Sequence, residues 1–251
     1  MPSNRGSHPA DDEQFAPEQV PSLRAAVHDL AWLRTRGYGD SSSCKMVGDR
    51  YRLKRRQRNA VARSACSDEE RAHRLVRRRA PTGLAGQWLD VDGFNVLISV
   101  EGMLGGAYLF VGRDGAYRDV DPVQGTYRVV EETRSAIRAV GAVMSDLGVR
   151  GMTWWLDAHV SNVGRVQARL AELTPSALDW TIEIRDDVDT QLAQSAHVVA
   201  TSDSDILDRA EAWCSVEQAV HLRLSDSPNV VDLRPRADLR PGPPHGRSVA
   251  S

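Results

Sequence analysis

The sequence predicts an α/β fold with a mostly parallel sheet and helices on both faces, preceded by a small, basic, all-helical module. Two patterns predict this arrangement. From Trp88 onward, short apolar runs alternate with helical segments, as in right-handed β–α–β units. Before Pro81, apolar residues recur at helical spacing and arginine is abundant. A chain of 251 residues can hold one substantial α/β domain and a small second module.

The helical module is predicted over residues 21–80. Apolar residues at helical spacing predict a first helix over 22–37. A second helix is predicted over 49–66. Ser67 and Glu70 have the spacing of a capping box, which predicts that a third helix begins directly after Ser67.

After a linker at 81–86, the α/β domain is predicted to span residues 87–234. The glycine-rich stretch 112–128 is expected to form a hairpin or an extended loop. Both chain ends, 1–20 and 235–251, are rich in Pro, Gly, Ser and charge, and we expect disordered tails there. Strands are predicted near 88–92, 107–111, 151–157, 180–185, 196–201 and 229–233, and helices near 94–104, 129–147, 161–173 and 203–213.

Charge is distributed unevenly along the chain. Residues 45–79 carry thirteen Lys or Arg side chains against four acids, which gives +9 and leaves −11 for the remainder. A basic part joined to an acidic part predicts a polyanionic partner, namely a nucleic acid and most simply RNA. A solvated arginine-rich surface is the alternative interpretation. The predicted nucleic-acid ligands are Arg50, Arg52, Lys54, Arg55, Arg56 and Arg58.

Cysteine usage and hydropathy bound the protein class. The three cysteines form no CxxC pair and no zinc-type spacing, so neither a disulfide framework nor a structural zinc is predicted. The first twenty residues lack the apolar core of a signal peptide, and no apolar run approaches about eighteen residues. We therefore expect a cytoplasmic protein with no membrane partner. These patterns do not determine the oligomeric state.

Aspartates follow three of the predicted strands. Asp92 and Asp157 each end a strand, and Asp203 and Asp205 follow a third. Since the carboxyl ends of parallel strands share one edge of a sheet, these side chains are expected to converge. Two carboxylates about 4 Å apart repel by about 4 kcal/mol at an effective dielectric of 20, so a cluster must take up protons or a cation.

An all-oxygen cluster of this kind suits Mg²⁺ or Mn²⁺. Such an ion can generate hydroxide and stabilise the charge on a reacting phosphodiester. The sequence therefore predicts a metal-dependent ribonuclease in which Asp92, Asp157, Asp203 and Asp205 bind the metal.

Neighbouring polar residues are expected to support the cluster. Asn95, Thr201 and Ser202 can fix the carboxylates or a metal-bound water through hydrogen bonds. Glu131 and Glu132 are predicted at the start of the long helix, and either could face the site. Acids at a helix N-terminus also occur without any function, because they favour the positive end of the helix dipole. In the same way, Asp203 could serve only as a helix N-cap.

Two motifs resemble those of a known superfamily. The segment VDGFNVL, which contains Asp92, resembles the first motif of the PIN-like nucleases, particularly their NYN branch, in which this aspartate binds metal. The segment VVATSDSDI is similar to their Thr-small-Asp-x-Asp string, which implies metal binding by Asp203 and Asp205. Those domains also have an aspartate in a position similar to that of Asp157. About residues 20–233 resemble a family that joins a domain of unknown function to a PIN-like domain, which implies the PIN-like fold.

Two other interpretations remain open. A PIN-like scaffold can keep its acids for structure, so a non-catalytic RNA-binding protein is the first alternative. The second is a phosphatase of the haloacid-dehalogenase type, because DVDGF resembles the DxDG motif, with Asp90 as the nucleophile and Asp92 as the acid/base. That family normally has a downstream lysine, whereas Lys45 and Lys54, the two lysines of this chain, both precede the motif.

Overall fold

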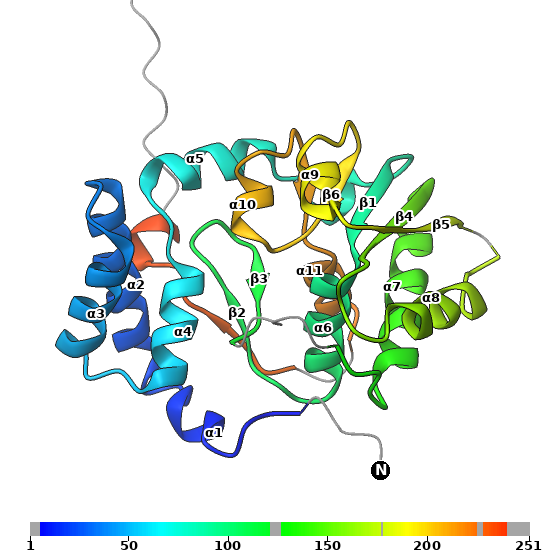
Figure 1. Ribbon diagram of the computed structural model, residues 1–251. Helices are drawn as coiled ribbons and strands as arrows, with labels where there is room; N and C mark the ends of the chain where they lie inside the picture. Colours follow the sequence, from blue (N-terminus) through cyan, green and yellow to red (C-terminus); the bar gives the residue numbers. More distant parts are fainter. Residues whose placement is uncertain (1–5, 121–126, 177, 225–227, 240–251) are drawn as a thin grey trace, which may run out of the picture.

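The computed structural model describes residues 6–120, 127–176, 178–224 and 228–239. The N-terminal part of the molecule is a helical module, drawn in blue and cyan in Figure 1. The helices of the module are α1 (Asp11–Gln14), α2 (Val20–Thr35), α3 (Asp40–Arg50), α4 (Arg55–Ser64) and α5 (Asp68–Arg77).

The module differs from the prediction in two places. The helix predicted over 49–66 is divided between α3 and α4, because Arg52 has φ = 51°, a left-handed conformation in which an α-helix cannot continue. Residues 6–20, predicted to lie in a disordered tail, contain α1 and the buried ring of Phe15. The capping box is confirmed, since Ser67 Oγ accepts from the backbone N–H of Glu70 and Glu70 Oε2 accepts from that of Ser67.

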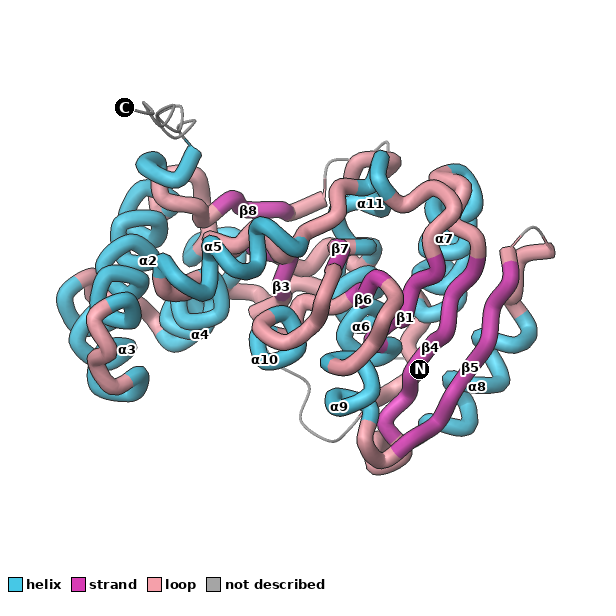
Figure 2. Tube along the Cα trace, turned by 90° about the horizontal axis from the view of Figure 1, so that it is seen from above, coloured by secondary structure: helices cyan, strands magenta, loops and turns pink. Residues whose placement is uncertain are grey.

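The main sheet consists of five parallel strands in the order β5-β4-β1-β6-β7. Figure 2 shows its edge strand β5 and the helical module at opposite ends of the molecule. The chain leaves the central strand β1 toward β4 and β5, and later returns to its other side as β6 and β7. The strands are β1 (Trp88–Asp92), β4 (Gly151–Asp157), β5 (Asp179–Arg185), β6 (Val198–Ala200) and β7 (Trp213–Cys214).

Helices pack on both faces of the main sheet. One face shares a large apolar core with α6, α7, α8 and α11, and it contributes Leu89, Val91 and Trp154. On the other face, α9, α10 and Val199 form a smaller cluster. The helices are α6 (Gly93–Leu104), α7 (Thr133–Asp146), α8 (Val163–Glu172), α9 (Val188–Ala193), α10 (Ser204–Leu207) and α11 (Val216–His221). Among the described residues, no helix combines the length and the apolar character needed to cross a membrane.

A second sheet, in the order β3-β2-β8, lies next to the helical module. The predicted hairpin is present, because β2 and β3 pair antiparallel. Part of the predicted segment, residues 121–126, lies outside the described residues. The remaining elements are β2 (Leu109–Val111), β3 (Tyr117–Arg118), β8 (Val230–Asp232) and the 3₁₀ turns η1 (Pro81–Gly83) and η2 (Arg236–Leu239).

This small sheet joins the helical module to the α/β part. Phe110 and Leu233 are buried in the same core as Leu23 and Val61 of the module. Part of the segment predicted as a C-terminal tail is also ordered, because Asp238 in η2 forms an ion pair with Arg113. Residues 240–251 of the predicted tail lie outside the described residues. The helical module and the α/β part are therefore packed together rather than connected only by a linker.

Candidate active site

A cleft of about 810 Å³ lies between the helical module and the carboxyl-terminal edge of the main sheet. Among the described residues, nine carboxylates and four guanidinium groups line the cleft, an excess of five negative charges when all are ionised. A charge imbalance of this size favours the uptake of protons or cations. The carboxylates belong to Asp40, Glu70, Asp92, Asp119, Asp157, Asp189, Asp203, Asp205 and Asp208.

Sheet topology brings Asp92 and Asp203 to the same point. Strands β1 and β6 are neighbours, and the connections from their carboxyl ends run in opposite directions along the sheet. Such a switch point leaves a crevice in which ligands of α/β proteins bind. Thr201 Oγ1 donates a hydrogen bond of 2.7 Å to Asp92 Oδ2 and so ties the two strand ends together.

Gly93 allows the strand carrying Asp92 to lie close to β4. A Cβ atom at this position would lie 2.5 Å from Leu156 Cδ2 and 2.8 Å from the carbonyl oxygen of Trp155. The backbone of Gly93 does not adopt a positive φ. Close packing, rather than an unusual backbone turn, therefore requires glycine next to Asp92.

The loop after β6 is fixed by side chains that the sequence singles out. Asn95 Oδ1 accepts hydrogen bonds of 2.9 Å from both the backbone N–H and the hydroxyl of Ser202. Asp203 Oδ1 accepts from the N–H of Asp205 at 2.8 Å and caps the short helix α10. Asp203 is thus an N-cap, and it lines the cleft as well.

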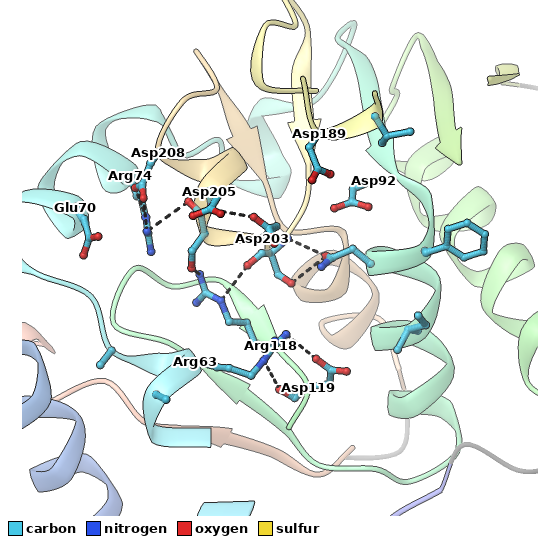
Figure 3. A pocket seen from close by; sticks show the side chains of 18 of the residues that line it. Arg63, Glu70, Arg74, Asp92, Arg118, Asp119, Asp189, Asp203, Asp205 and Asp208 are labelled. Carbon is cyan, nitrogen blue, oxygen red and sulfur yellow. Dashed lines mark hydrogen bonds and ion pairs between the residues drawn. The ribbon is translucent and has the colours of Figure 1, made fainter. Parts of the chain in front are cut away.

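The carboxylates of this edge act on one another electrostatically. Burial, together with the negative charges of Asp203 and Asp189, raises the pKa of Asp92 to about 7, although the hydrogen bond from Thr201 partly opposes this rise. Burial and the charges of Asp203 and Asp157 also raise the pKa of Asp189. Figure 3 shows Asp92, Asp189 and Asp203 gathered in one part of the cleft.

Asp189 is the site residue that the sequence analysis missed. It lies on α9, a helix of only six residues that begins within the acid-rich stretch RDDVD at 185–189. Neither feature distinguishes Asp189 from Asp186 or Asp187, because so short a helix gives no clear apolar periodicity. Its approach to Asp92 becomes visible only when α9 packs beside β1 and β4.

The other predicted acids are divided between the cleft and the outside. Asp157 and Asp205 line the cleft, and Asp157 Oδ1 accepts a hydrogen bond of 2.7 Å from the N–H of His159. Glu131 and Glu132 do not line the cleft. The sequence predicted both glutamates in the first turn of the long helix. They precede it instead, because α7 begins only at Thr133.

The donor set of the cleft fits a hard divalent cation in its chemistry. Carboxylate and hydroxyl oxygens predominate near Asp92, as Mg²⁺ and Mn²⁺ prefer. Within the described parts of the chain, however, no three His, Cys, Asp or Glu side chains are already grouped closely enough to hold a metal ion. A cation at this edge would therefore keep several of its waters, as Mg²⁺ usually does.

Each of the four arginines in the cleft has a carboxylate partner. Arg118 donates two hydrogen bonds to Asp114, at 2.8 and 2.7 Å, and Arg74 donates a third at 2.8 Å. Arg74 also pairs with Asp208 at 2.6 Å. The other two pairs are Arg34 with Asp40 and Arg63 with Asp119.

The predicted nucleic-acid ligands lie elsewhere on the module. Arg56 forms a bidentate pair with Asp11, which is almost fully buried, so its role is at least partly structural. Arg58 contacts Asp49, and Arg50 lies 3.4 Å from an oxygen of Asp29. Arg52, Lys54 and Arg55 are exposed. None of these six described side chains lines the cleft.

Comparison with known proteins extends over both parts of the molecule. A model described as "Domain of unknown function (DUF5616)" matches residues 81–219, which include Asp92, Asp157, Asp189 and Asp203. The chain belongs to this family. A second model, "Protein of unknown function (DUF434)", matches residues 22–77 of the helical module.

A relative from Methanocaldococcus jannaschii extends this comparison. Over 189 residues, the chain is 29% identical to the "Uncharacterized protein MJ0935" of that archaeon. The aligned region covers 74% of this chain and 89% of the relative. No solved structure matches the chain significantly. The similarity to the relative therefore extends well beyond the residues of the cleft.

Proposed function

We propose that this protein is a PIN-like nuclease that depends on Mg²⁺ or Mn²⁺ and hydrolyses phosphodiester bonds in RNA. The observation that carries the proposal is the convergence of Asp92, Asp189 and Asp203 at the switch point of the parallel sheet. In the proposed site these three carboxylates would face the reacting phosphate, and Asp157 and Asp205 line the same cleft.

Charge supports a cation-dependent reaction on a polyanion. A phosphodiester strand entering this cleft would meet carboxylates in excess over arginines that already have partners. The strand and the carboxylates can come together only if a cation neutralises part of the charge. A bound divalent ion would supply that neutralisation and lower the pKa of an attacking water.

The residues around the acids have positioning roles in this proposal. Thr201 fixes one oxygen of Asp92, and Asn95 holds the loop that presents Asp203. Because Asp92 is partly protonated near neutral pH, it would have to lose that proton before it could hold a cation. The resemblance of VDGFNVL and VVATSDSDI to PIN-like motifs agrees with these assignments.

The phosphatase alternative has less support. Asp90, which would be its nucleophile, is buried, and its Oδ2 accepts a hydrogen bond of 2.6 Å from Ser195. Asp90 is also absent from the lining of the cleft. Its carboxylate is therefore poorly placed to attack a substrate there.

A cleavage assay tests the proposal. A labelled single-stranded RNA of about twenty nucleotides should be cut in Mn²⁺ or Mg²⁺ and remain intact in EDTA. Asp92→Asn should slow cleavage more than the roughly 10- to 100-fold typical of residues that only orient metal ligands. The matched control is Glu131→Gln, an exposed acid outside the cleft, which should cleave as fast as the wild type.

Three other results would overturn the nuclease assignment. Binding of RNA without cleavage in either metal would identify a non-catalytic binder. Hydrolysis of p-nitrophenyl phosphate, with RNA left intact, would favour the phosphatase. Equal cleavage by wild type and Asp92→Asn would show that a contaminant or a different site cuts the RNA.

A further inference from the structure

Two large aromatic side chains are exposed where α2 ends. The exposed fraction is 46% for Trp32 and 55% for Tyr38. Their ring centroids lie 6.5 Å apart with 23° between the planes, and the guanidinium carbon of Arg36 lies 3.7 Å from the Trp32 centroid. Exposed aromatic rings grouped with a cation are more typical of a binding surface than of a solvated helix end.

The backbone holds Tyr38 in a fixed position. Gly37 has φ = +73°, its N–H donates to the carbonyl of Arg34, and the N–H of Tyr38 donates to the carbonyl of Leu33. These two bonds form a Schellman motif, which terminates α2. Tyr38 is thus placed before any ligand binds, which lowers the entropy cost of using its ring.

Tyr38 also lines the same cleft as the proposed catalytic carboxylates. Arg34, with its partner Asp40, lies beside Tyr38 in the wall formed by the helical module. Asp92, Asp189 and Asp203 lie on the wall formed by the main sheet. A ligand that fills the cleft would therefore meet the ring of Tyr38 and the Arg34–Asp40 pair at one end and the carboxylates of the main sheet at the other. Trp32 is not among the described residues that line the cleft, and its ring centroid lies 6.5 Å from that of Tyr38.

We propose that Trp32 and Tyr38 form a base-stacking site on the helical module for an unpaired nucleotide of the strand whose phosphodiester lies at the carboxylates. This inference rests on the proposed function. Flat apolar rings next to arginines match the two parts of a nucleotide, because rings stack on its base and guanidinium groups attract its phosphate. A base paired in a duplex has no free face to offer the site, so the site would select single strands.

Binding measurements in a cleavage-deficient background test this inference. The parent is the Asp92→Asn protein, and the doubly substituted variant carries Trp32→Ala and Tyr38→Ala in addition. The affinity of each for a labelled single-stranded RNA is measured by fluorescence anisotropy. Loss of stacking should weaken binding by roughly 5- to 150-fold. Tyr38→Phe, which keeps the ring, should bind like the parent. Met46→Ala is the matched control, because Met46 is 57% exposed on α3 and lies outside the cleft.

An abasic scan makes the test specific. One position of the RNA should, when its base is removed, weaken binding to the parent but not to the doubly substituted variant. Three results would each overturn the stacking site. The parent and the variant could bind single strands with equal affinity, the variant could lose as much affinity for a blunt duplex as for a single strand, or the parent could fail to bind RNA.

The stacking site and the nuclease can fail separately. If the wild type cuts no RNA in Mn²⁺ but the stacking variants lose affinity, the proposed function fails and the stacking site stands. If the wild type cuts RNA and the stacking variants retain its KM, the stacking site fails and the nuclease stands.

Discussion

Two aspartates of this protein, the half-buried Asp92 and the buried Asp114, differ in how their charge is balanced. Burial by itself raises the pKa of both carboxyl groups. For Asp114, the charges of Arg118 and Arg74 outweigh burial and hold the pKa well below its usual range. Near Asp92 the strongest charges are those of two other aspartates, and the pKa rises to about 7.

The comparison separates a structural carboxylate from a candidate functional one. The carboxylate of Asp114 has its counter-charges within the protein and joins the β2–β3 hairpin to α5. Among the residues that the structure describes, no Lys or Arg forms an ion pair with Asp92, which lies in an open cleft. An acid without a cationic partner gains no stability from its charge, and in the proposed site a bound cation would supply the missing charge.

The largest expected effect is on the free energy of unfolding, when Asp114 loses its charge. Asp114→Asn leaves Arg118, which is 2% exposed, without its carboxylate, and we expect a loss of about 3–5 kcal/mol in the free energy of unfolding. Urea denaturation measures this loss. Asp208→Asn, which removes a more exposed partner of Arg74, should cost clearly less. A loss below about 1 kcal/mol in Asp114→Asn would contradict the structural role.

At Asp92, removal of the charge should stabilise the protein instead of destabilising it. The folded pKa of Asp92, about 7, lies above its ordinary value of 3.8, so wild-type stability falls as the pH rises through this interval. Without added metal at pH 8, Asp92→Asn should therefore melt higher than wild type, by roughly 5 °C. The difference should vanish near pH 4, where Asp92 is protonated in the folded protein. A lower melting temperature in Asp92→Asn at pH 8 would show that the ionised carboxylate stabilises the fold.

Divalent cations should neutralise part of the negative charge around Asp92 and so stabilise the folded protein. With Mn²⁺ at ten times its Kd, binding to the folded state alone adds about 1.4 kcal/mol, or roughly 3–6 °C in Tm. The shift should be larger at pH 8 than at pH 6, because the proton on Asp92 competes with the metal. Differential scanning calorimetry with and without Mn²⁺ measures it. Asp189→Asn should reduce the shift and Glu131→Gln should not; equal shifts in the two variants would place the cation elsewhere.

The smallest effect concerns the arginines of the module. Arg55 is exposed, so Arg55→Gln should leave the melting temperature unchanged. A plot of log affinity for RNA against log salt should become less steep, its negative slope decreasing in magnitude by about 0.7. Arg56→Gln should instead destabilise the protein, since it leaves the carboxylate of Asp11 buried. An unchanged salt slope in Arg55→Gln would exclude a phosphate contact at that position.

Much of the fold could be predicted from local pattern. The strands at 88–92 and 151–157 have their predicted bounds, because each is an apolar run bounded by polar or glycine residues. Short elements were missed, among them α9, α11 and β7, since two to six residues give too little periodicity to recognise. The long helix α7 begins four residues later than predicted, at Thr133, whose hydroxyl donates to Glu101 at 2.6 Å.

The candidate site was predictable where the acids follow strands. Asp92, Asp157, Asp203 and Asp205 line one cleft because parallel strands end at one edge. Asp189 was not predictable, since its helix is short and its neighbours are equally acidic. The partners of the arginines were also hidden, because Arg74 and Asp208 are 134 positions apart in the sequence.

By itself, the sequence determined the longer strands and helices and the position of the acids relative to strand ends. These features depend on contacts between residues close together in the chain. Only the tertiary structure decided which charges are neutralised, since the energy of two charges depends on their distance and on the surrounding dielectric. Packing gave Asp114 two arginines and left Asp92 facing other carboxylates.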